Sequence, residues 1–138
     1  MRRLLVLAMA LTTTLAAAGC SDSTGPGASL AGTYALRSVN GVTPPVTVIA
    51  TTGYTLDVLA GSIVLDAQGN YTGTIRYRET YSGSAPTQYD DTIVGYWTLS
   101  GNQLTLVDTQ TSTSYYGTVS GSTITLTDGS GYTEVYGK

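Results

Sequence analysis

The sequence predicts an all-β protein: an antiparallel up-and-down meander of eight or nine short strands, closed into a small barrel, behind a signal peptide and a flexible tether. Its 138 residues include eleven tyrosines and seventeen glycines but no histidine or phenylalanine, and a tyrosine- and threonine-rich composition favours strands. Past residue 20, apolar residues alternate in short runs between glycine turns, without a helical period. Closure removes exposed strand edges. A β-sandwich of the same strands is the alternative.

The N-terminus predicts export. Arg2 and Arg3 precede an uncharged apolar run over 4–18, which is shorter than the roughly 20 residues that span a bilayer as a helix. Three small residues then lead into Cys20, the only cysteine of the chain. This layout is typical of a secretory signal peptide, which we place at 1–19.

Small residues ending in Gly19-Cys20 resemble the lipobox of bacterial lipoproteins, with Ala17 where leucine is commonest. The resemblance implies that Cys20 becomes the first mature residue, carries lipid such as palmitate, and anchors the protein to a membrane of the bacterial cell envelope. The alternative is cleavage after the alanines at 16–18, which would release a soluble protein. A lone exposed cysteine is a liability in an oxidising compartment, which favours lipidation. Ser21 does not resemble the aspartate retention signal, and this favours the outer membrane over the inner.

A tether and one domain follow. Residues 20–29 are small or polar and predict a flexible tether, which leaves 30–138 as a single domain. The mature chain has four basic and nine acidic residues, a formal charge of −5. Because its basic residues are few and dispersed, we expect no nucleic-acid partner.

Turn residues mark the first strands. Residues 31–39 predict a strand, and the Asn-Gly pair that follows favours a type I′ turn. Two consecutive prolines then interrupt pairing, because proline has no N–H to donate. Residues 45–50 and 54–66 supply two or three more strands, with a bend at Gly61.

Later turns also fix the strand register. The loop DAQGN, with Gly69 in the left-handed position, pairs Leu65 with Tyr71. The segments SGNQLTLVD and SGSTITLTD, twenty residues apart, are two hairpins in which glycine comes first in a two-residue turn. That turn pairs Leu99 with Leu104, and likewise brings the apolar residues of each hairpin to one face.

Between these hairpins lie the strands YTGTIRYRETY and YDDTIVGYWTL, joined by the loop SGSAPTQ. If Tyr81 faces Tyr89, Glu79 faces Asp91 on the inner face, near the open mouth of the barrel. Two such carboxylates could share a proton and act as acid and base. They could instead be solvated carboxylates ringed by tyrosines, or polar contacts for a small apolar ligand. We expect the ligand-binding residues to be Tyr77, Glu79, Tyr81, Tyr89, Asp91 and Trp97.

Missing residue types limit the chemistry. Without histidine there is no Ser-His-Asp or Cys-His arrangement, and a lipidated cysteine removes the remaining usual zinc or copper ligand. The only lysine is the last residue, so a buried Schiff-base lysine is not expected. We therefore expect no catalytic residues, no metal and no cofactor, and we do not expect an enzyme.

The order Leu30-x-Gly32-x-Tyr34 resembles the Gly-x-Trp start of the lipocalins, and Gly95-x-Trp97-x-Leu99 resembles bacterial lipocalin-like domains. The resemblance covers 30–137 and implies an up-and-down barrel around a central pocket. The sequence departs from it in two ways: the second lipocalin motif is missing, and no last-strand arginine is available to pack on the first-strand aromatic residue.

These observations predict a lipid-anchored envelope lipoprotein whose barrel binds a small hydrophobic ligand. The alternative is an interaction or structural module with a filled barrel, and a third hypothesis is a hydrolase using Glu79 and Asp91. Interior volume distinguishes the first two, because ligand pockets start at roughly 300 Å³. The inward side chains of Tyr71, Tyr77 and Trp97 fill space, whereas glycines at 73, 95 and 117 leave room, and the sequence does not decide between these opposing effects.

Overall fold

The computed structural model describes residues 29–127, 129 and 131–138. The predicted signal peptide, Cys20 and all of the tether except residue 29 lie outside the described residues. Nine strands make up the fold: β1 (Gly32–Val39), β2 (Val46–Thr51), β3 (Tyr54–Leu65), β4 (Asn70–Tyr81), β5 (Thr87–Ser100), β6 (Gln103–Asp108), β7 (Ser114–Ser120), β8 (Thr123–Thr127) and β9 (Thr133–Gly137). Among the described residues, no helix is long and apolar enough to cross a membrane.

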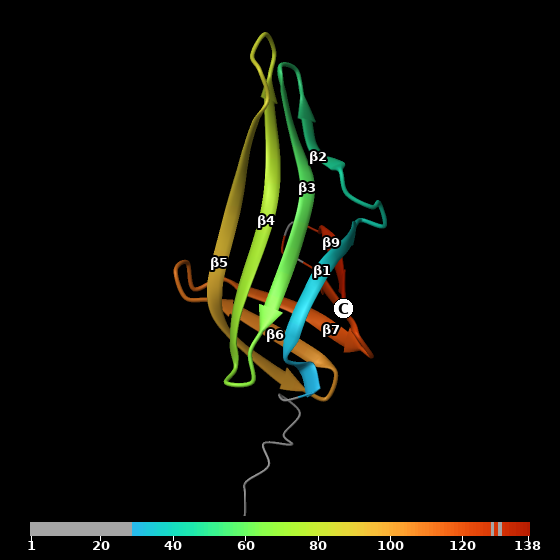
Figure 1. Ribbon diagram of the computed structural model, residues 1–138, viewed down its shortest axis with the longest axis vertical. Helices are drawn as coiled ribbons and strands as arrows, with labels where there is room; N and C mark the ends of the chain where they lie inside the picture. Colours follow the sequence, from blue (N-terminus) through green and yellow to red (C-terminus); the bar gives the residue numbers. More distant parts are fainter. Residues whose placement is uncertain (1–28, 128, 130) are drawn as a thin grey trace, which may run out of the picture.

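The strands form one antiparallel sheet in the order β1-β9-β8-β7-β6-β5-β4-β3-β2, and pairing of β1 with β3 closes it (Figure 1). The closed ring therefore contains eight strands, with β2 as an additional strand on the edge of β3. This confirms the predicted closed up-and-down barrel, and the β-sandwich alternative is wrong.

Strand β3 is shared between β1 and β2. Its C-terminal half pairs with β1, as in Ala35 with Ser62, and its N-terminal half pairs with β2, as in Val46 with Val58. The predicted bend falls in a different place, because β3 runs through Gly61 without a break and its register shifts between Val58 and Ala60. One long strand therefore replaces the two that the sequence left open for 54–66.

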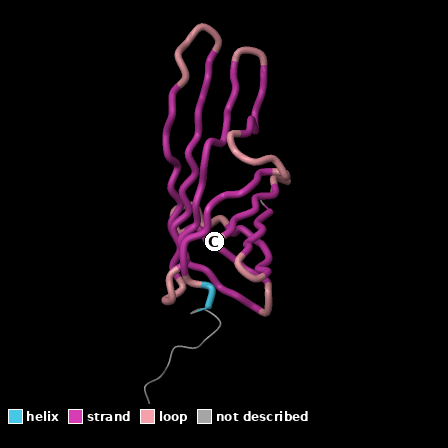
Figure 2. The backbone as a smooth tube through the Cα atoms, turned by 45° about the vertical axis from the view of Figure 1, so that its right-hand side comes forward, coloured by secondary structure: helices cyan, strands magenta, loops and turns pink. Residues whose placement is uncertain are grey.

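Part of the sheet continues beyond the ring. Strand β6 pairs with β5 only from Gly95 onward, so the N-terminal half of β5 pairs with β4 alone. The hairpins β2–β3 and β4–β5 stand side by side above the crossed strands (Figure 2). We call this part, formed by β2 and the adjoining parts of β3, β4 and β5, the extension, and the opposite end of the barrel the closed end.

The predicted turns are confirmed where glycine fixes them. Gly69 has a φ of 91° and Leu65 pairs with Tyr71. The two C-terminal hairpins have the predicted register, with Leu99 opposite Leu104 and Val119 opposite Ile124. In each hairpin the turn is so short that it permits a single pairing.

The predicted register of β4 against β5 is wrong by four residues. Tyr77 rather than Tyr81 faces Tyr89, Glu79 faces Thr87, and Asp91 faces Ile75. An even shift leaves every side chain on its predicted face, so alternation alone could not detect it. The connecting loop does not contain a two-residue turn signal that would have fixed the register.

The inward glycines at 95 and 117 do not leave space for a ligand. A Cβ on Gly95 would lie 1.8 Å from the Val107 carbonyl oxygen, and one on Gly117 would lie 2.3 Å from the Thr125 carbonyl oxygen. Glycine is needed at these positions because neighbouring backbone approaches closely. Gly73 is different, since its nearest neighbour is the Tyr71 ring at 3.9 Å.

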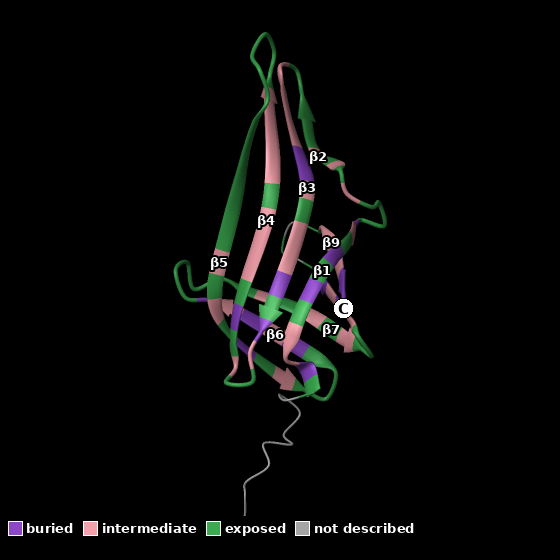
Figure 3. Ribbon diagram, in the orientation of Figure 1, coloured by how far each residue is buried: buried purple, intermediate pink, exposed green. Residues whose placement is uncertain are grey.

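The core fills the closed end, where buried residues concentrate (Figure 3). Its most deeply buried large side chains are Tyr34, Leu65, Leu104, Ile124 and Tyr136. The Nζ of Lys138 lies 4.8 Å from the centre of the Tyr34 ring and donates to the Ala31 carbonyl. The sequence has no last-strand arginine to pack on the first-strand aromatic residue. Lys138 instead provides the cation over the Tyr34 ring.

Candidate functional site: a cavity in the barrel

A cavity of about 240 Å³ lies inside the barrel. Its lining combines five aliphatic side chains, four tyrosines, two carboxylates and one glycine: Ile63, Ile75, Ile93, Leu106, Leu126, Tyr71, Tyr77, Tyr115, Tyr136, Asp91, Glu134 and Gly73. On β4 the lining runs from Tyr71 in the ring to Tyr77 at the base of the extension, so the cavity reaches the open end of the barrel.

A second cavity of about 210 Å³ adjoins the first, because Tyr77 and Glu134 line both. Its other walls come from β1, β2, β3 and the segment before β9, and they are mostly apolar: Val39, Val48, Ile49, Leu56, Val58 and Tyr132. Strand β2 therefore forms a wall of the second cavity, although it lies outside the closed ring.

Tyr71 lines the first cavity and carries an unmatched polar group. The residue is 4% exposed, and its hydroxyl has no hydrogen-bond partner among the described residues. Burial, with a smaller effect from the charge of Asp108, raises its pKa to about 12, so the hydroxyl is protonated at neutral pH. Buried polar groups without a partner are rare in folded proteins, so this hydroxyl is an unsatisfied group of the barrel interior.

The carboxylate of Glu134 lies between two tyrosines. The Tyr136 hydroxyl donates to Glu134 Oε2 at 2.7 Å, and burial followed by the charge of Glu134 raises the Tyr136 pKa. Burial, Glu134 and Asp91 together raise the pKa of Tyr77 to about 12. The two carboxylates thus give this cavity a negative potential that disfavours a further negative charge.

A second carboxylate cluster lies on the same face, within the extension. The hydroxyls of Tyr54 and Tyr89 donate to Glu79 Oε1 at 3.0 and 3.4 Å. The ring centres of Tyr54 and Tyr81 are 4.9 Å apart, and partial burial with the nearby Glu79 raises the pKa of Tyr54 to about 12. Tyr77 connects this cluster to the cavity, since its ring lies 5.5 Å from that of Tyr89.

The structure divides the six predicted ligand-binding residues into three groups. Tyr77 and Asp91 line the cavity, while Glu79, Tyr81 and Tyr89 belong to the extension cluster. Trp97 lines neither cavity and packs at the closed end, where its Nε1 donates to the Asp66 carbonyl at 3.1 Å. Lipid attachment at Cys20 lies outside the described residues.

The predicted pairing of Glu79 with Asp91 is wrong. Asp91 faces Ile75, four residues along β4 from Glu79, which corresponds to roughly 13 Å of strand. The two carboxyl groups share a face but are not cross-strand neighbours. An acid-base pair made from these two residues is therefore ruled out.

Sequence reasoning missed the contribution of the C-terminal strands. Leu126 faces Glu134, and Ile124 faces Tyr136, so alternation along the last hairpin places both polar residues inside. Pairing the last strand by the method used for the earlier hairpins would have found them. Tyr115 sits opposite Leu106, another inward position readable from the same frame.

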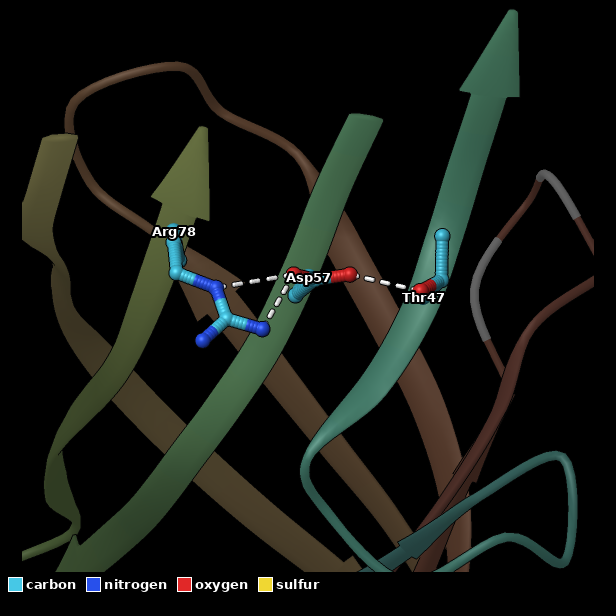
Figure 4. Close-up of polar contacts among 3 residues, drawn as sticks. All are labelled: Thr47, Asp57 and Arg78. Carbon is cyan, nitrogen blue, oxygen red and sulfur yellow. Dashed lines mark hydrogen bonds and ion pairs between the residues drawn. The ribbon is translucent and has the colours of Figure 1, made fainter. Parts of the chain in front are cut away.

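The arginines of β4 lie on the outer face of the sheet and not in the lining of the cavities. On the outer face, Thr47 donates to Asp57 Oδ1 at 2.6 Å and Arg78 donates to Asp57 Oδ2 (Figure 4). Arg76 pairs with Asp90 at 2.7 Å. No Lys or Arg is among the described residues that line either cavity, and those residues contain no group of three or more His, Cys, Asp or Glu placed to hold a metal.

Fold and site define a closed antiparallel β-barrel with an internal cavity open toward a sheet extension. Comparison with protein-family models, curated proteins and solved structures finds no match for the chain. The resemblance to lipocalin-like domains therefore stays a prediction from its sequence motifs.

Proposed function

We propose that this protein is a non-enzymatic lipoprotein of the bacterial cell envelope, lipid-anchored through Cys20 at the outer membrane, whose barrel binds a small, largely hydrophobic ligand. The observation that carries the proposal is the cavity itself. Its apolar lining of isoleucines and leucines with a few convergent polar groups is the composition of small-molecule sites.

The cavity volume supports a small ligand. About 240 Å³ is below the roughly 300 Å³ at which drug-sized pockets begin. An apolar cavity of about 150 Å³ nevertheless holds benzene, so the volume of about 240 Å³ is enough for a molecule of that size. A single-ring or short-chain molecule is therefore the size class we propose.

The position of the first described residues, Ser29 and Leu30, supports the proposed anchoring geometry. The first described residues precede β1 at the closed end, and the extension rises from the opposite end (Figure 1). A lipid on Cys20 would be joined by the predicted tether to the closed end, opposite the mouth of the cavity, so the anchor would not need to cross that mouth.

Native mass spectrometry of the protein, purified from the envelope of the cells that make it, tests ligand binding. We expect a mass increase from a small co-purifying molecule, which denaturing conditions remove. Labelling with radioactive fatty acid tests the anchor, with Cys20→Ser as the control that loses label. A chain without added mass, and without affinity for any small apolar probe, would contradict the binding proposal.

A second candidate function has its own supporting observation. Residues 87–93 of β5 lack a strand partner on one side among the described residues, and exposed aromatic side chains lie nearby, including Tyr81, Tyr89 and Tyr96. Free strand edges can pair with another chain. An interaction module would bind a protein through this edge and would do so equally well with the cavity filled.

A further inference from the structure

The N-terminal half of β5 has an open strand edge. It pairs with β4 on one side, while β6 pairs with β5 only from Gly95 onward. Contacts on that side end at Thr109, whose backbone N–H and hydroxyl donate to the Val94 carbonyl at 3.1 and 3.0 Å. Residues 87–92 are exposed (Figure 3). Within the extension, β5 therefore lacks a second neighbouring strand among the described residues.

Alternation along β5 identifies the unpaired backbone groups. In an antiparallel pair, the N–H and C=O of one residue point to the partner strand, and those of the next residue point away from it. The Val94 carbonyl points away from β4 to Thr109, whereas the Trp97 N–H points the other way and donates to the Gly69 carbonyl. By the same alternation, three residues of the edge direct both backbone groups away from β4: Gln88, Asp90 and Thr92. Such a row is a template for an extended chain that adds to the sheet.

The other edge of the extension is interrupted. The pairing of β2 with β3 shifts register between Thr47 and Ile49, which breaks the regular spacing along β2. The Tyr132 hydroxyl, from the segment before β9, donates to the Val48 carbonyl. Over its paired residues, β5 shows no register shift against β4. The regular and accessible edge of the extension is therefore that of β5.

The two faces of this edge differ in the charge that they offer to a partner strand. On the outer face, Asp90 already accepts from Arg76 at 2.7 and 3.0 Å. The inner face has the order Tyr89, Asp91 and Ile93, and Asp91 makes no hydrogen bond or ion pair among the described residues. Opposite charges across two strands stabilise a pair, and like charges destabilise it. A second copy of this edge would bring aspartates close to aspartates, so the charge favours a basic partner over self-pairing.

From these observations, and resting on the second candidate function, we propose that the β5 edge binds an extended segment of another protein that places a lysine or arginine beside Asp91. The segment adds to the extension as a further strand and takes up the free backbone groups of the edge. Its residues beside Tyr89 and Ile93 are β-branched or aromatic, because such cross-strand pairs stabilise a sheet.

Nuclear magnetic resonance titration of the full chain with three synthetic peptides tests this. Acetyl-TVTKTVT-amide has the proposed pattern, and acetyl-TVTETVT-amide carries an acidic residue in place of the basic one. Acetyl-TVPKPVT-amide keeps the charge but lacks two backbone donors, because proline has no N–H. We expect the lysine peptide to bind about fivefold more tightly than the glutamate peptide, and the proline peptide to bind most weakly.

Amide hydrogen exchange in the same samples locates the contact. In the free chain, the amides of residues 88, 90 and 92 should exchange faster than those of 89, 91 and 93, which point toward β4. The lysine peptide should slow exchange at 88, 90 and 92, and the proline peptide should not.

A matched pair of variants locates the charge. Asp91→Asn should reduce the preference for the lysine peptide over the glutamate peptide to within about twofold. Asp90→Asn makes the same charge change one residue away, on the outer face of β5, and should retain the preference. Asp91→Lys should reverse it, so that the glutamate peptide binds more tightly. Circular dichroism verifies the fold of each variant.

The outcomes separate this proposal from the function on which it rests. If the lysine and glutamate peptides protect the edge amides equally, or if Asp91→Asn behaves like Asp90→Asn, the edge binds strands but does not select a basic one. If the proline peptide binds as tightly as the lysine peptide, the contact is not strand addition. If no peptide changes exchange at these amides, both the basic partner and the second candidate function are wrong.

Discussion

Arg78 on β4 donates two hydrogen bonds to one carboxylate oxygen of Asp57 on β3, at 2.9 and 2.7 Å, while Thr47 on β2 donates to the other oxygen at 2.6 Å. The three residues lie side by side across three strands (Figure 4). Strand β2 is outside the closed ring, so this polar row links it to the barrel wall through side chains as well as backbone.

Replacing Asp57 should therefore loosen the extension. We expect Asp57→Asn to lower the free energy of unfolding by only about 1 kcal/mol, because the Arg78 side chain is part-exposed and solvent screens the ion pair. Asp90→Asn, which breaks the more exposed pair with Arg76, should cost less than half as much. Urea unfolding measures both, and equal losses would argue against a special role for the row.

Acid should destabilise the protein in a defined pH range. Hydrogen bonds to the carboxylates lower the pKa values of Asp57, Asp66, Asp90 and Asp108, with Thr47, Asn70, Arg76 and Thr111 as the main donors, respectively. As the pH falls, these carboxylates bind protons in the unfolded chain before they do so in the folded protein, at pH values near 4. The stabilisation is therefore complete above pH 4 and is lost as the pH falls through the lower folded pKa values.

Thermal unfolding followed by circular dichroism between pH 2 and 7 checks this dependence. As the pH is lowered from 7, the melting temperature should stay constant down to about pH 4 and should fall steadily below it. In Asp108→Asn the fall should be shallower, because one of the contributing carboxylates is gone. A melting temperature that rises on acidification would contradict the expected sign.

Sequence reasoning succeeded where turn chemistry fixed a register. The two-residue turns before Gln103 and Thr123, and the loop at Gly69, specify the pairing of their strands, and the structure has those pairings. It failed at the loop between Tyr81 and Thr87, because shifts of two or four residues preserve the inner face. The face of the sheet on which each candidate residue lies was therefore predictable, but its cross-strand neighbour was not.

The free volume of the cavity depends on close backbone contacts that a sequence does not reveal. Glycines at 95 and 117 suggested free volume, but close backbone approach uses it. Gly73 kept its space, since only the Tyr71 ring lies near it. Whether an inward glycine opens a cavity or permits a tight strand crossing depends on the local coiling of the sheet.

Two glycine variants should separate packing from binding. A Cβ at Gly95 would clash with the Val107 carbonyl oxygen at 1.8 Å and with the Tyr71 ring at 2.9 Å, so Gly95→Ala should lower the free energy of unfolding by about 3 kcal/mol or more. Gly73→Ala meets its nearest atom at 3.9 Å and should change stability by less than about 1 kcal/mol.

Ligand affinity should respond clearly to Gly73→Ala, the variant that remains folded and changes stability least. Gly73 lines the cavity, so the methyl group of Gly73→Ala takes up space and should weaken binding of a small apolar probe severalfold. Calorimetric titration and urea unfolding of the same samples give both values. If Gly73→Ala binds the probe as the unaltered chain does, the ligand does not occupy this cavity.

Two tyrosine-to-phenylalanine variants should have stability effects of opposite sign. The Tyr34 hydroxyl donates to the Leu30 carbonyl at 2.7 Å, and removing it should lower the free energy of unfolding by about 1 kcal/mol. The Tyr71 hydroxyl is buried without a partner among the described residues, so Tyr71→Phe removes an unmet desolvation cost and should raise the free energy of unfolding by about 1 kcal/mol in the ligand-free protein. Both residues are tyrosines 4% exposed or less, so the change in ring burial is matched. Urea unfolding of ligand-free samples measures the two values, and a loss of stability in Tyr71→Phe equal to that in Tyr34→Phe would mean that an ordered water or another group already satisfies the Tyr71 hydroxyl.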